Sequence, residues 1–291
     1  MSLPAMRVIF FTVQPAVVVN TIISSFEQLG QKVLLVVTTP GPKARPTEAY
    51  KDIASETRRD VDVLVTNHIK RLPALLAGLE PDLIFVAGFP WRLPPELLSL
   101  PRLGCINTHP SLLPRYRGPN PLFWQVMNGE TEGGLTVHRM DADFDTGPIL
   151  VQRSFPIEPD DDVDSLYPKL LTQGATMIPE ALALAAAGAP GTPQPADGSY
   201  APLCGEAEQW LDWSRPAAYL RNQVRAWGQA GARAEIEGQK YRVYRARVVD
   251  LSPGLAKARQ GMLLEHSNVG MLINTGDGGL LLEEAELKPG E

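Results

Sequence analysis

The sequence is poor in cysteine and has no long apolar run. Its 291 residues include only Cys105 and Cys204, which stand alone rather than in a disulfide or metal-binding pattern. Isolated thiols persist most easily in a reducing compartment. No uncharged apolar stretch approaches the ~20 residues that cross a bilayer, and the N-terminus lacks the charged and apolar regions of a signal peptide. We therefore expect a cytoplasmic protein without a membrane partner.

Glycine is absent from the first predicted turn. Residues 7–13 form an apolar, β-branched run typical of a buried strand, and the turn after it reads Val13-Gln14-Pro15. A dinucleotide-binding sheet needs glycines there so that the main chain can approach the pyrophosphate, and an NAD enzyme is therefore disfavoured. The chain also lacks a glycine-lysine phosphate loop, an HExxH pair and paired cysteines, so we expect no metal.

The chain has no net positive charge with which to coat a nucleic acid. The chain has 27 Lys and Arg residues against 33 Asp and Glu, a formal net charge of −6. This argues mildly against extended nucleic-acid binding, but not against a local basic patch. One predicted strand does carry a basic run with tyrosines between its members: Lys240, Arg242, Arg245 and Arg247. A solvated strand face is the simpler interpretation, and a surface that grips RNA is the alternative.

Strand-like and helix-like segments alternate through the first half of the chain. Such alternation favours right-handed crossovers, so we predict an α/β, Rossmann-like, mostly parallel sheet with helices on both faces. A long helix over 166–187 contains Pro179, which we expect to kink or split it. The predicted strands are 7–13, 32–38, 61–65, 82–87, 104–109, 135–140 and 149–155.

A Gly- and Pro-rich stretch over 189–204 separates this half from a different pattern. A helix over 217–227 is followed by five short strands, 232–236, 240–249, 261–265, 270–274 and 280–284. Five short strands separated by turns predict a small C-terminal β-barrel of the OB-like type. The predicted organisation is therefore a catalytic domain over 1–188, a linker over 189–204 and a barrel domain over 205–291.

Three polar side chains suggest acyl-transfer chemistry. Asn107 and His109 are two positions apart on a strand, so they face the same side at its carboxyl end, where open α/β sheets bind ligands. Asp145 lies in an Asp- and Gly-rich loop that could fold back over this end. When an amine attacks a formyl carbon, amide and imidazole N–H groups can stabilise the negative oxygen. A carboxylate would raise the pKa of the histidine and order water for proton transfer.

A structural interpretation of the same residues is open. A single histidine after a strand is more often a surface or structural residue, and an Asp-rich loop is by default solvated or caps the next element. Spacing alone therefore does not decide between structure and catalysis.

A long ordered motif then narrows the choice. It consists of Asn107-x-His109-x-Ser111-Leu112-Leu113-Pro114-x-Tyr116-Arg117-Gly118, then Asn128-Gly129-Glu130, Thr136-x-His138-x-Met140-Asp141 and Asp145-x-Gly147. The motif resembles the folate-dependent formyltransferase family, which includes methionyl-tRNA, glycinamide ribonucleotide and nucleotide-sugar enzymes as well as a formyltetrahydrofolate hydrolase domain. Tyr200-Ala201-Pro202 and Leu211-Asp212-Trp213-Ser214 further resemble the start of the C-terminal barrel in the tRNA and sugar enzymes.

The resemblance implies roles for individual residues. It makes Asn107, His109 and Asp145 catalytic and 10-formyltetrahydrofolate the co-substrate. It places the folate pocket at Phe89, Pro90, Trp91, Arg92, Leu93, Asp141, Asp143 and Phe144. It assigns acceptor binding to Ser111, Arg117, Gly118, Thr136 and His138.

The acceptor is the open question at this point. The loop over 39–46 is short and only lightly basic, which together with the overall acidity favours a small amine such as an amino sugar or an amino-acid-derived metabolite. Methionyl-tRNA is the alternative acceptor within the same chemistry. Hydrolysis with water as acceptor, and a non-catalytic folate-binding protein, are further alternatives.

Overall fold

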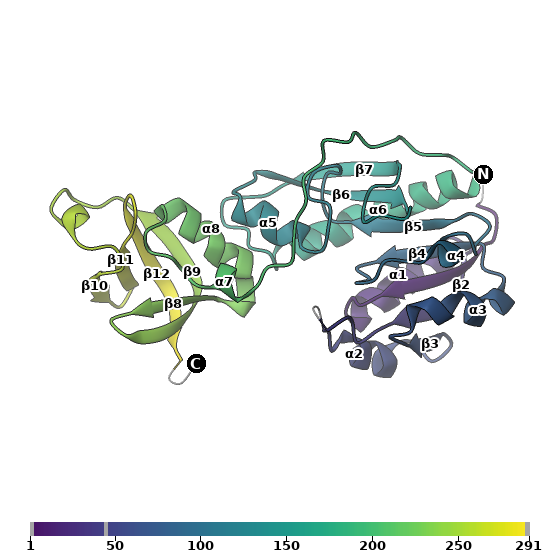
Figure 1. Cartoon of the computed structure of the whole chain (residues 1–291), viewed down its shortest axis with the longest axis horizontal. Helices are drawn as coiled ribbons and strands as arrows, with labels where there is room; N and C mark the ends of the chain where they lie inside the picture. The colour runs from purple at the N-terminus through teal and green to yellow at the C-terminus, as the bar shows by residue number, and fades with distance from the viewer. Residues whose placement is uncertain (1–2, 44–45, 289–291) are drawn as a thin grey trace. The chain divides into compact units, whose positions relative to one another are not determined.

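A computed structural model describes residues 3–43 and 46–288 of the chain (Figure 1). The chain divides into two compact units, which are described separately. The first comprises Met1–Pro119, Gly134–Ser154 and Leu171–Tyr200, and the second Asn120–Gly133, Phe155–Leu170 and Ala201–Glu291. No helix in the described ranges is long and apolar enough to span a bilayer. Ala44 and Arg45, part of the predicted lightly basic loop, lie outside the described residues.

A seven-stranded sheet forms the first unit, in the order β3-β2-β1-β4-β5-β6-β7. The pairs from β3 to β5 are parallel, whereas β5 pairs with β6 in antiparallel fashion. The predicted α/β, mostly parallel sheet is therefore confirmed. The strands are β1 (Arg7–Thr12), β2 (Lys32–Thr38), β3 (Asp62–Val65), β4 (Leu83–Ala87), β5 (Cys105–His109), β6 (Glu132–Arg139) and β7 (Ile149–Pro156).

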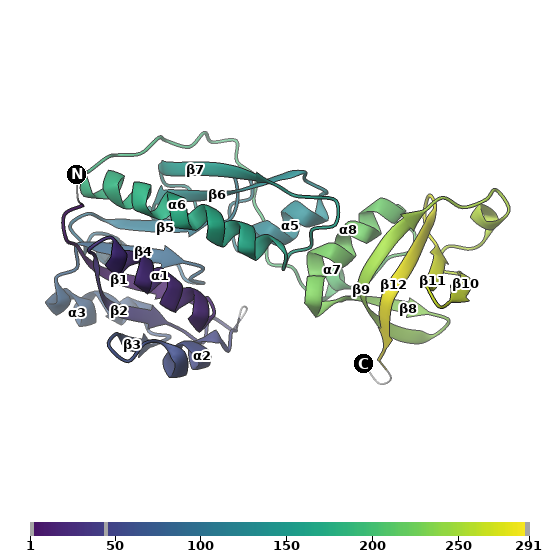
Figure 2. The ribbon, with the colours of Figure 1, turned by 180° about the vertical axis from the view of Figure 1, so that it is seen from behind.

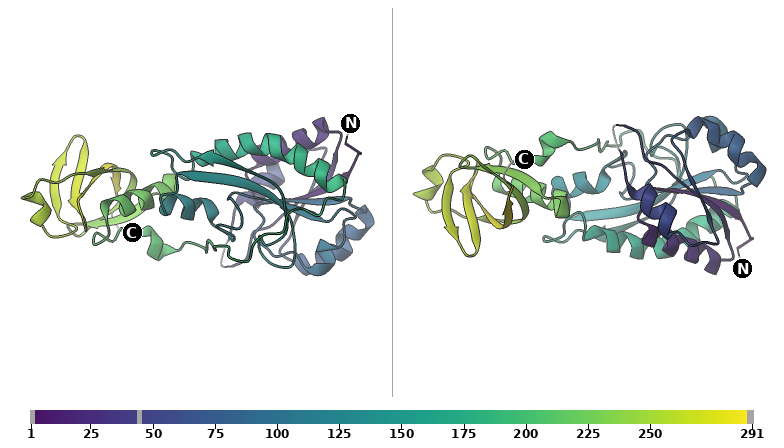
Figure 3. Two further views of the ribbon diagram at one scale, coloured as in Figure 1. Left: turned by 90° about the horizontal axis from the view of Figure 1, so that it is seen from above. Right: turned by 90° about the horizontal axis from the view of Figure 1, so that it is seen from below.

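Both faces of this sheet are covered, because successive side chains of a strand point to opposite sides. On one face, the ring of Phe85 of β4 contacts Phe10 of β1 at a tilt and Phe26 of α1 edge-on. Ile9 and Phe11 belong instead to a cluster with the helices of the other face. Figure 3 shows helices on both sides of the strands. They are α1 (Ala16–Gln28), α2 (Ala49–Glu56), α3 (Leu72–Leu76), α4 (Pro95–Leu98) and the turns η1 (Ile69–Arg71) and η2 (Ala77–Leu79).

The long helix α6 (Leu166–Ala186) runs through Pro179 without a break in its assignment. The predicted split at this proline is therefore wrong. An interior proline removes one hydrogen bond and costs about 3 kcal/mol or more. Met177, Ala181 and Leu182 nearby are fully buried, and the burial of their apolar surface offsets that cost. Figure 2 shows α6 running beside the sheet of the first unit.

The second unit contains a five-stranded antiparallel sheet in the order β10-β11-β12-β9-β8. All five predicted C-terminal strands are present, as expected for a small barrel. Its apolar core combines the inner face of the sheet with Leu220 and Val224 of α8. The elements are α5 (Pro121–Met127), α7 (Glu206–Gln209), α8 (Ala217–Trp227), η3 (Gly228–Ala230), η4 (Leu255–Lys257), β8 (Ala232–Ile236), β9 (Gln239–Val249), β10 (Leu263–Ser267), β11 (Gly270–Asn274) and β12 (Gly279–Leu287).

The predicted basic run on β9 is partly neutralised within this unit. Arg245 and Arg247 both bind Glu283, with nitrogen–oxygen distances of 3.2 and 3.0 Å. Both guanidinium side chains are nonetheless more than half exposed. Tyr241 packs against the core, and the Tyr244 hydroxyl donates to Glu286. Two of the four cations of the predicted basic run therefore share one acidic partner.

Candidate active site

The carboxyl end of β5 lies between β4 and β6. Asn107 pairs with Val86 of β4 on one side and with His138 of β6 on the other. β6 runs antiparallel to β5, and its last residues, Thr136 to Arg139, lie beside residues 106–109 of β5. His138 therefore faces Asn107 directly across the strands.

Asp145 lies within reach of both β5 side chains, as the sequence predicts. Its Oδ1 accepts a hydrogen bond from Asn107 Nδ2 at 3.2 Å and lies 3.5 Å from His109 Nδ1. Its Oδ2 accepts from the main-chain N–H of Gly118 at 2.9 Å. The residue has φ +58°, in the left-handed region that aspartate tolerates better than most residues. An amide, an imidazole and a carboxylate therefore meet at one point.

His138 is a fourth member of this cluster. Its Nδ1 lies 2.8 Å from the Arg139 carbonyl, which can only accept, so Nδ1 carries the proton. The neutral ring can then accept from Asn107 Nδ2, 3.2 Å from its Nε2, and the same Nε2 is 3.5 Å from Asp145 Oδ1. Both amide hydrogens of Asn107 are thereby occupied, one by His138 and one by Asp145.

His109 is buried and held by a carbonyl. Its Nε2 lies 2.8 Å from the Tyr116 carbonyl, so Nε2 donates and Nδ1 faces Asp145. Burial lowers the pKa of His109 below its ordinary 6.5, against the opposing effects of the Asp145 carboxylate and the Tyr116 carbonyl. Sequence reasoning considered only the carboxylate, which raises this pKa. The net shift is downward because the ring is only 4% exposed.

Asp145 stays ionised in this environment. Burial by itself would raise the pKa of its carboxyl group, but the protonated forms of His109 and His138 and the Gly118 N–H outweigh burial, and the pKa lies well below its ordinary 3.8. With His109 neutral, the N–H donors of Gly118 and Asn107 are the contacts that favour the charged carboxylate. The site therefore combines a carboxylate with a neutral imidazole near pH 7.

Two of the predicted acceptor-binding hydroxyls are fully buried. The Thr136 hydroxyl donates to the Ser111 carbonyl at 2.6 Å and accepts from Gln152 Nε2 at 2.9 Å. The Ser111 hydroxyl donates to the Arg115 carbonyl at 2.7 Å. Both side chains have no exposed surface. They hold the loop that follows β5.

The other predicted acceptor residues lie beside Asp145. Gly118 supplies the N–H described above, and Arg117 directs its Nε and Nη2 to Gln194 Oε1 at 3.1 and 2.8 Å. Gln194 was not identified from the sequence, since it stands in the Gly- and Pro-rich stretch. The residue type and its position gave no signal there.

The residues predicted for folate divide into packed and exposed groups. Leu93 belongs to the apolar cluster around Ile9 and Phe11, and Phe89 and Trp91 pack against that cluster. Trp91 Nε1 also donates to the Thr39 hydroxyl. Pro90 is half-buried. Asp141 closes its own loop, because its Oδ1 accepts from the Asp143 N–H and the Thr146 hydroxyl.

Exposed side chains join the two predicted folate segments. Arg92 binds Asp143 with a nitrogen–oxygen distance of 3.2 Å, and its guanidinium lies 5.0 Å from the centre of the Phe144 ring. Both charged side chains are more than half exposed. The segments around β4 and after β6 are therefore neighbours, as a shared pocket requires.

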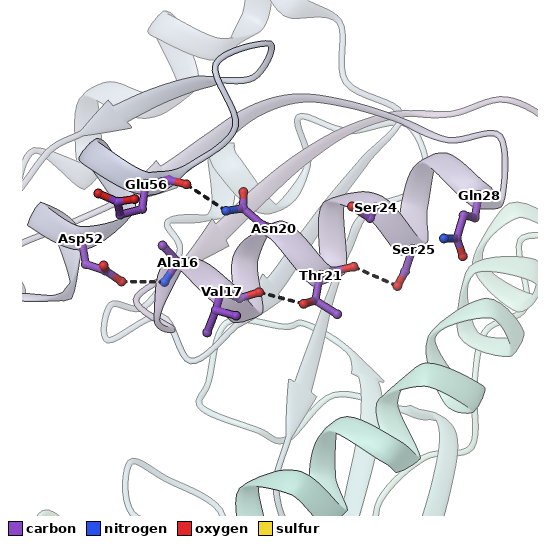
Figure 4. Close-up of a pocket in the computed structure, with 9 residues that line it drawn as sticks. All are labelled: Ala16, Val17, Asn20, Thr21, Ser24, Ser25, Gln28, Asp52 and Glu56. Carbon is purple, nitrogen blue, oxygen red and sulfur yellow. Dashed lines mark hydrogen bonds between the residues drawn. The ribbon is translucent and has the colours of Figure 1, made fainter.

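A groove of about 670 Å³ lies elsewhere in the first unit, on α1 and α2 (Figure 4). Asp52 accepts from the Ala16 N–H there, and Asn20 donates to the Glu56 carbonyl. None of the residues predicted for catalysis or binding lines it. Within residues 3–43 and 46–288, no group of three or more His, Cys, Asp and Glu side chains is placed to hold a metal ion.

The fold and this cluster define a one-carbon transferase class, and comparison with known proteins agrees. Residues 6–182 match the family described as formyl transferase, and residues 205–291 match the formyl transferase C-terminal domain. The chain belongs to the formyl transferase family.

A curated relative agrees with this family, and solved structures share its fold. It is 38% identical over 267 residues to the methionyl-tRNA formyltransferase of Geobacter sulfurreducens, covering 89% of this chain and 83% of the relative. HypX from Aquifex aeolicus in complex with tetrahydrofolic acid has a TM-score of 0.68 at 20% identity, covering 97% of this chain and 44% of HypX. An N-formyltransferase from Helicobacter canadensis in complex with folinic acid and dTDP-3-aminofucose has a TM-score of 0.67 at 15% identity, over 97% and 100% of the two chains. The last two likenesses concern the fold alone.

Proposed function

We propose that this chain transfers the formyl group of 10-formyltetrahydrofolate to the amine of methionyl-tRNA. The contact of the Asp145 carboxylate with Asn107 and His109 carries the chemical part of the proposal. The acceptor rests on similarity, because the Geobacter sulfurreducens methionyl-tRNA formyltransferase is 38% identical over 89% of this chain. A cytoplasmic location, first expected from two isolated cysteines, suits this reaction.

The exposed part of the site suits a folate. Arg92, Asp143 and Phe144 are exposed and in contact with one another, and they combine hydrogen-bonding groups with an aromatic face. Phe89, Trp91 and Leu93 would support this group from within rather than contact the ligand by their polar atoms. Bound there, the folate supplies a formyl carbon for attack by an amine.

Each cluster residue then has a distinct role. Asn107 Nδ2 would leave one of its two present partners and donate to the oxygen that gains negative charge, as preorganised donors do in acyl transfer. His109, neutral and protonated on Nε2, would take the proton of the attacking amine on Nδ1. Asp145 would stabilise the resulting imidazolium. The proton held on Nδ1 is then available to the leaving nitrogen.

The remaining predicted residues support this arrangement. His138 would keep Asn107 and Asp145 in place, since its Nε2 lies 3.2 Å from the Asn107 amide and 3.5 Å from the Asp145 carboxylate. Ser111 and Thr136 would act through the loop that they hold. Gly118 and Arg117 lie beside Asp145 and remain proposed near the acceptor. We also propose a catalytic domain over 1–188, a linker over 189–204 and an OB-like barrel domain over 205–291.

A small-molecule amine is the second candidate acceptor. The formal net charge of −6 favours it, because a large anionic RNA is repelled by an acidic protein. The first turn after β1 also contains Gln14 and Pro15 instead of a glycine loop, so neither candidate gains a phosphate cradle there.

Mass analysis of the products separates the candidates. The chain is incubated with 10-formyltetrahydrofolate and with methionyl-tRNA, methionine amide or a panel of amino sugars in separate reactions. We expect a mass gain of one formyl unit on methionyl-tRNA at the highest rate. Formylation of an amino sugar without formylation of methionyl-tRNA would contradict the proposed acceptor and identify a small-molecule amine instead. Turnover of the folate in the absence of any amine would indicate hydrolysis.

A further inference from the structure

The stretch that the sequence suggests as a linker is bound along its length to the first unit. We call residues 189–200 the strap. The Ala189 carbonyl accepts from Arg139 Nε at 2.7 Å, and Thr192 exchanges two main-chain hydrogen bonds of 2.8 Å with Ile149. Further along, the Ser199 carbonyl accepts from the Arg117 N–H at 2.9 Å. The strap therefore contacts the end of β6 and the start of β7, which flank the loop that carries Asp145, and also the loop after β5.

Gln194 is the centre of these contacts. Its Nε2 donates to the carbonyl of Asp145 at 2.9 Å and to the carbonyl of Gly147 at 2.7 Å. Its Oε1 accepts from Nε and Nη2 of Arg117 at 3.1 and 2.8 Å. All four hydrogen-bonding positions of one amide side chain are thus used. One residue of the strap joins the loop after β5 to the loop that carries Asp145.

Asp145 depends on such support. Its backbone has φ +58°, outside the regions that non-glycine residues usually adopt. Its carboxylate also contacts Asn107, His109 and Gly118 at the same time, which one backbone position permits. A residue that binds the carbonyl of Asp145 itself fixes the peptide plane next to it, and so the direction in which the side chain leaves the chain.

We propose that Gln194 is a positioning residue, which holds the Asp145 carboxylate against Asn107 and His109 by binding the carbonyls of Asp145 and Gly147. This rests on the proposed formyl transfer and extends it to the strap. Gln194 acts through the main chain, because its amide nitrogen binds the carbonyls of Asp145 and Gly147 rather than the Asp145 carboxylate. The connecting segment is then part of the catalytic apparatus.

Two variants of the full chain test this role. Gln194→Glu keeps the acceptor for Arg117 and loses both donors, whereas Gln194→Met has a similar length without polar atoms or charge. The matched control is Gln223→Glu in α8, where Nε2 likewise donates to two carbonyls, those of Glu208 and Trp210, at 2.6 and 2.9 Å. Thermal unfolding of each variant gives the folded fraction to which rates are normalised.

We expect kcat to fall by ~10²-fold in both Gln194 variants, since a shift of about 1 Å in a catalytic group has an effect of this size. KM for 10-formyltetrahydrofolate should change far less than kcat. NMR titration should show the pKa of His109 falling further, because the displaced carboxylate no longer raises it. The Gln223→Glu control should keep kcat and the His109 titration of the parent chain.

Two results would overturn the inference. One is an unchanged kcat in both folded Gln194 variants. The other is a raised KM for the folate with kcat and the His109 titration unaltered, which would assign Gln194 to folate binding. A parent chain that formylates no acceptor in the panel would instead disprove the proposed function, so the two failures are distinguishable.

Discussion

At the scale of single residues, the site is a set of groups that hold one another. Asn107 gives one amide hydrogen to Asp145 and one to His138, while His109 gives its Nε2 proton to a carbonyl. Both amide hydrogens of Asn107 and the Nε2 proton of His109 are therefore bound within the cluster. A substrate oxygen must compete for Asn107, and the donor is already oriented when it does.

Replacement of Asn107 by alanine tests the role of this amide as the donor to the developing negative charge. We expect kcat to fall by ~10²–10³-fold, as when other such donors are removed, while the Kd for tetrahydrofolate measured by calorimetry stays near that of the parent. The control is Asn20→Ala in α1, where the asparagine amide bonds main chain with both its nitrogen and its oxygen. Parent-like kcat in Asn107→Ala would contradict the proposed mechanism.

The titration of His109 follows from its burial. We expect a pKa below 6.5, so the ring loses its proton before neutral pH and acts as the base. As pH falls through this value the base is protonated, and the acid limb of kcat should lie below pH 6.5. Asp145→Asn should lower the pKa further by removing a negative neighbour. Histidine NMR measures both, with the signal assigned by its loss in His109→Gln, and a pKa above 6.5 would refute the argument.

At the scale of elements, the sequence pattern predicted which side of a strand a residue faces, but not the continuity of a helix or the register between strands. The period of two in β5 correctly placed Asn107 and His109 on one side of the strand. The predicted split of α6 at Pro179 was wrong, because the low helix propensity of proline is offset by the burial of neighbouring residues. The His138 position was visible as part of a motif, but its contact with Asn107 depends on the antiparallel register of β6.

The turn after Asp145 gives an element-level prediction. A Cβ on Gly147 would collide with the main-chain carbonyl of Arg139. Because Arg139 is the last residue of β6, its carbonyl cannot move without disturbing the strand. Gly147→Ala should therefore lower the free energy of unfolding by about 1–3 kcal/mol. It should also reduce kcat, because the loop that carries Asp145 is displaced. Urea unfolding and rate assays measure the two effects.

Gly78→Ala in η2 is the control, since nothing lies within 4 Å of the added carbon. It should leave kcat unchanged and alter stability by less than about 1 kcal/mol. Equal stability of the two variants would show that the loop after Asp145 adapts to a side chain.

At the scale of the whole molecule, an acidic chain must bind an anionic acceptor if methionyl-tRNA is the substrate. Arg245 and Arg247 of β9 are exposed but share Glu283. Glu283→Gln should release both guanidinium groups, tighten tRNA binding and steepen its dependence on salt by about one unit of log–log slope. Filter binding at several salt concentrations measures this.

Glu180→Gln makes the same change of net charge in α6, where Glu180 pairs with Arg153. Its salt slope should match that of the parent. A parent-like slope in Glu283→Gln as well would leave β9 as the solvated strand face that the sequence first suggested, and RNA contacts would have to lie elsewhere on the chain.

The sequence by itself determined the alternation of strands and helices, the five short C-terminal strands and the polar pair at the end of β5, because these follow from periodicities of two and 3.6 residues. Only the tertiary structure decided which distant residues complete the site. His138 and Asn107 are 31 positions apart, and Gln194 and Asp145 are 49 apart. Such contacts depend on the register between strands and on the path of the connecting segment. The local sequence pattern determines neither, because it only places each residue on its own strand, helix or loop.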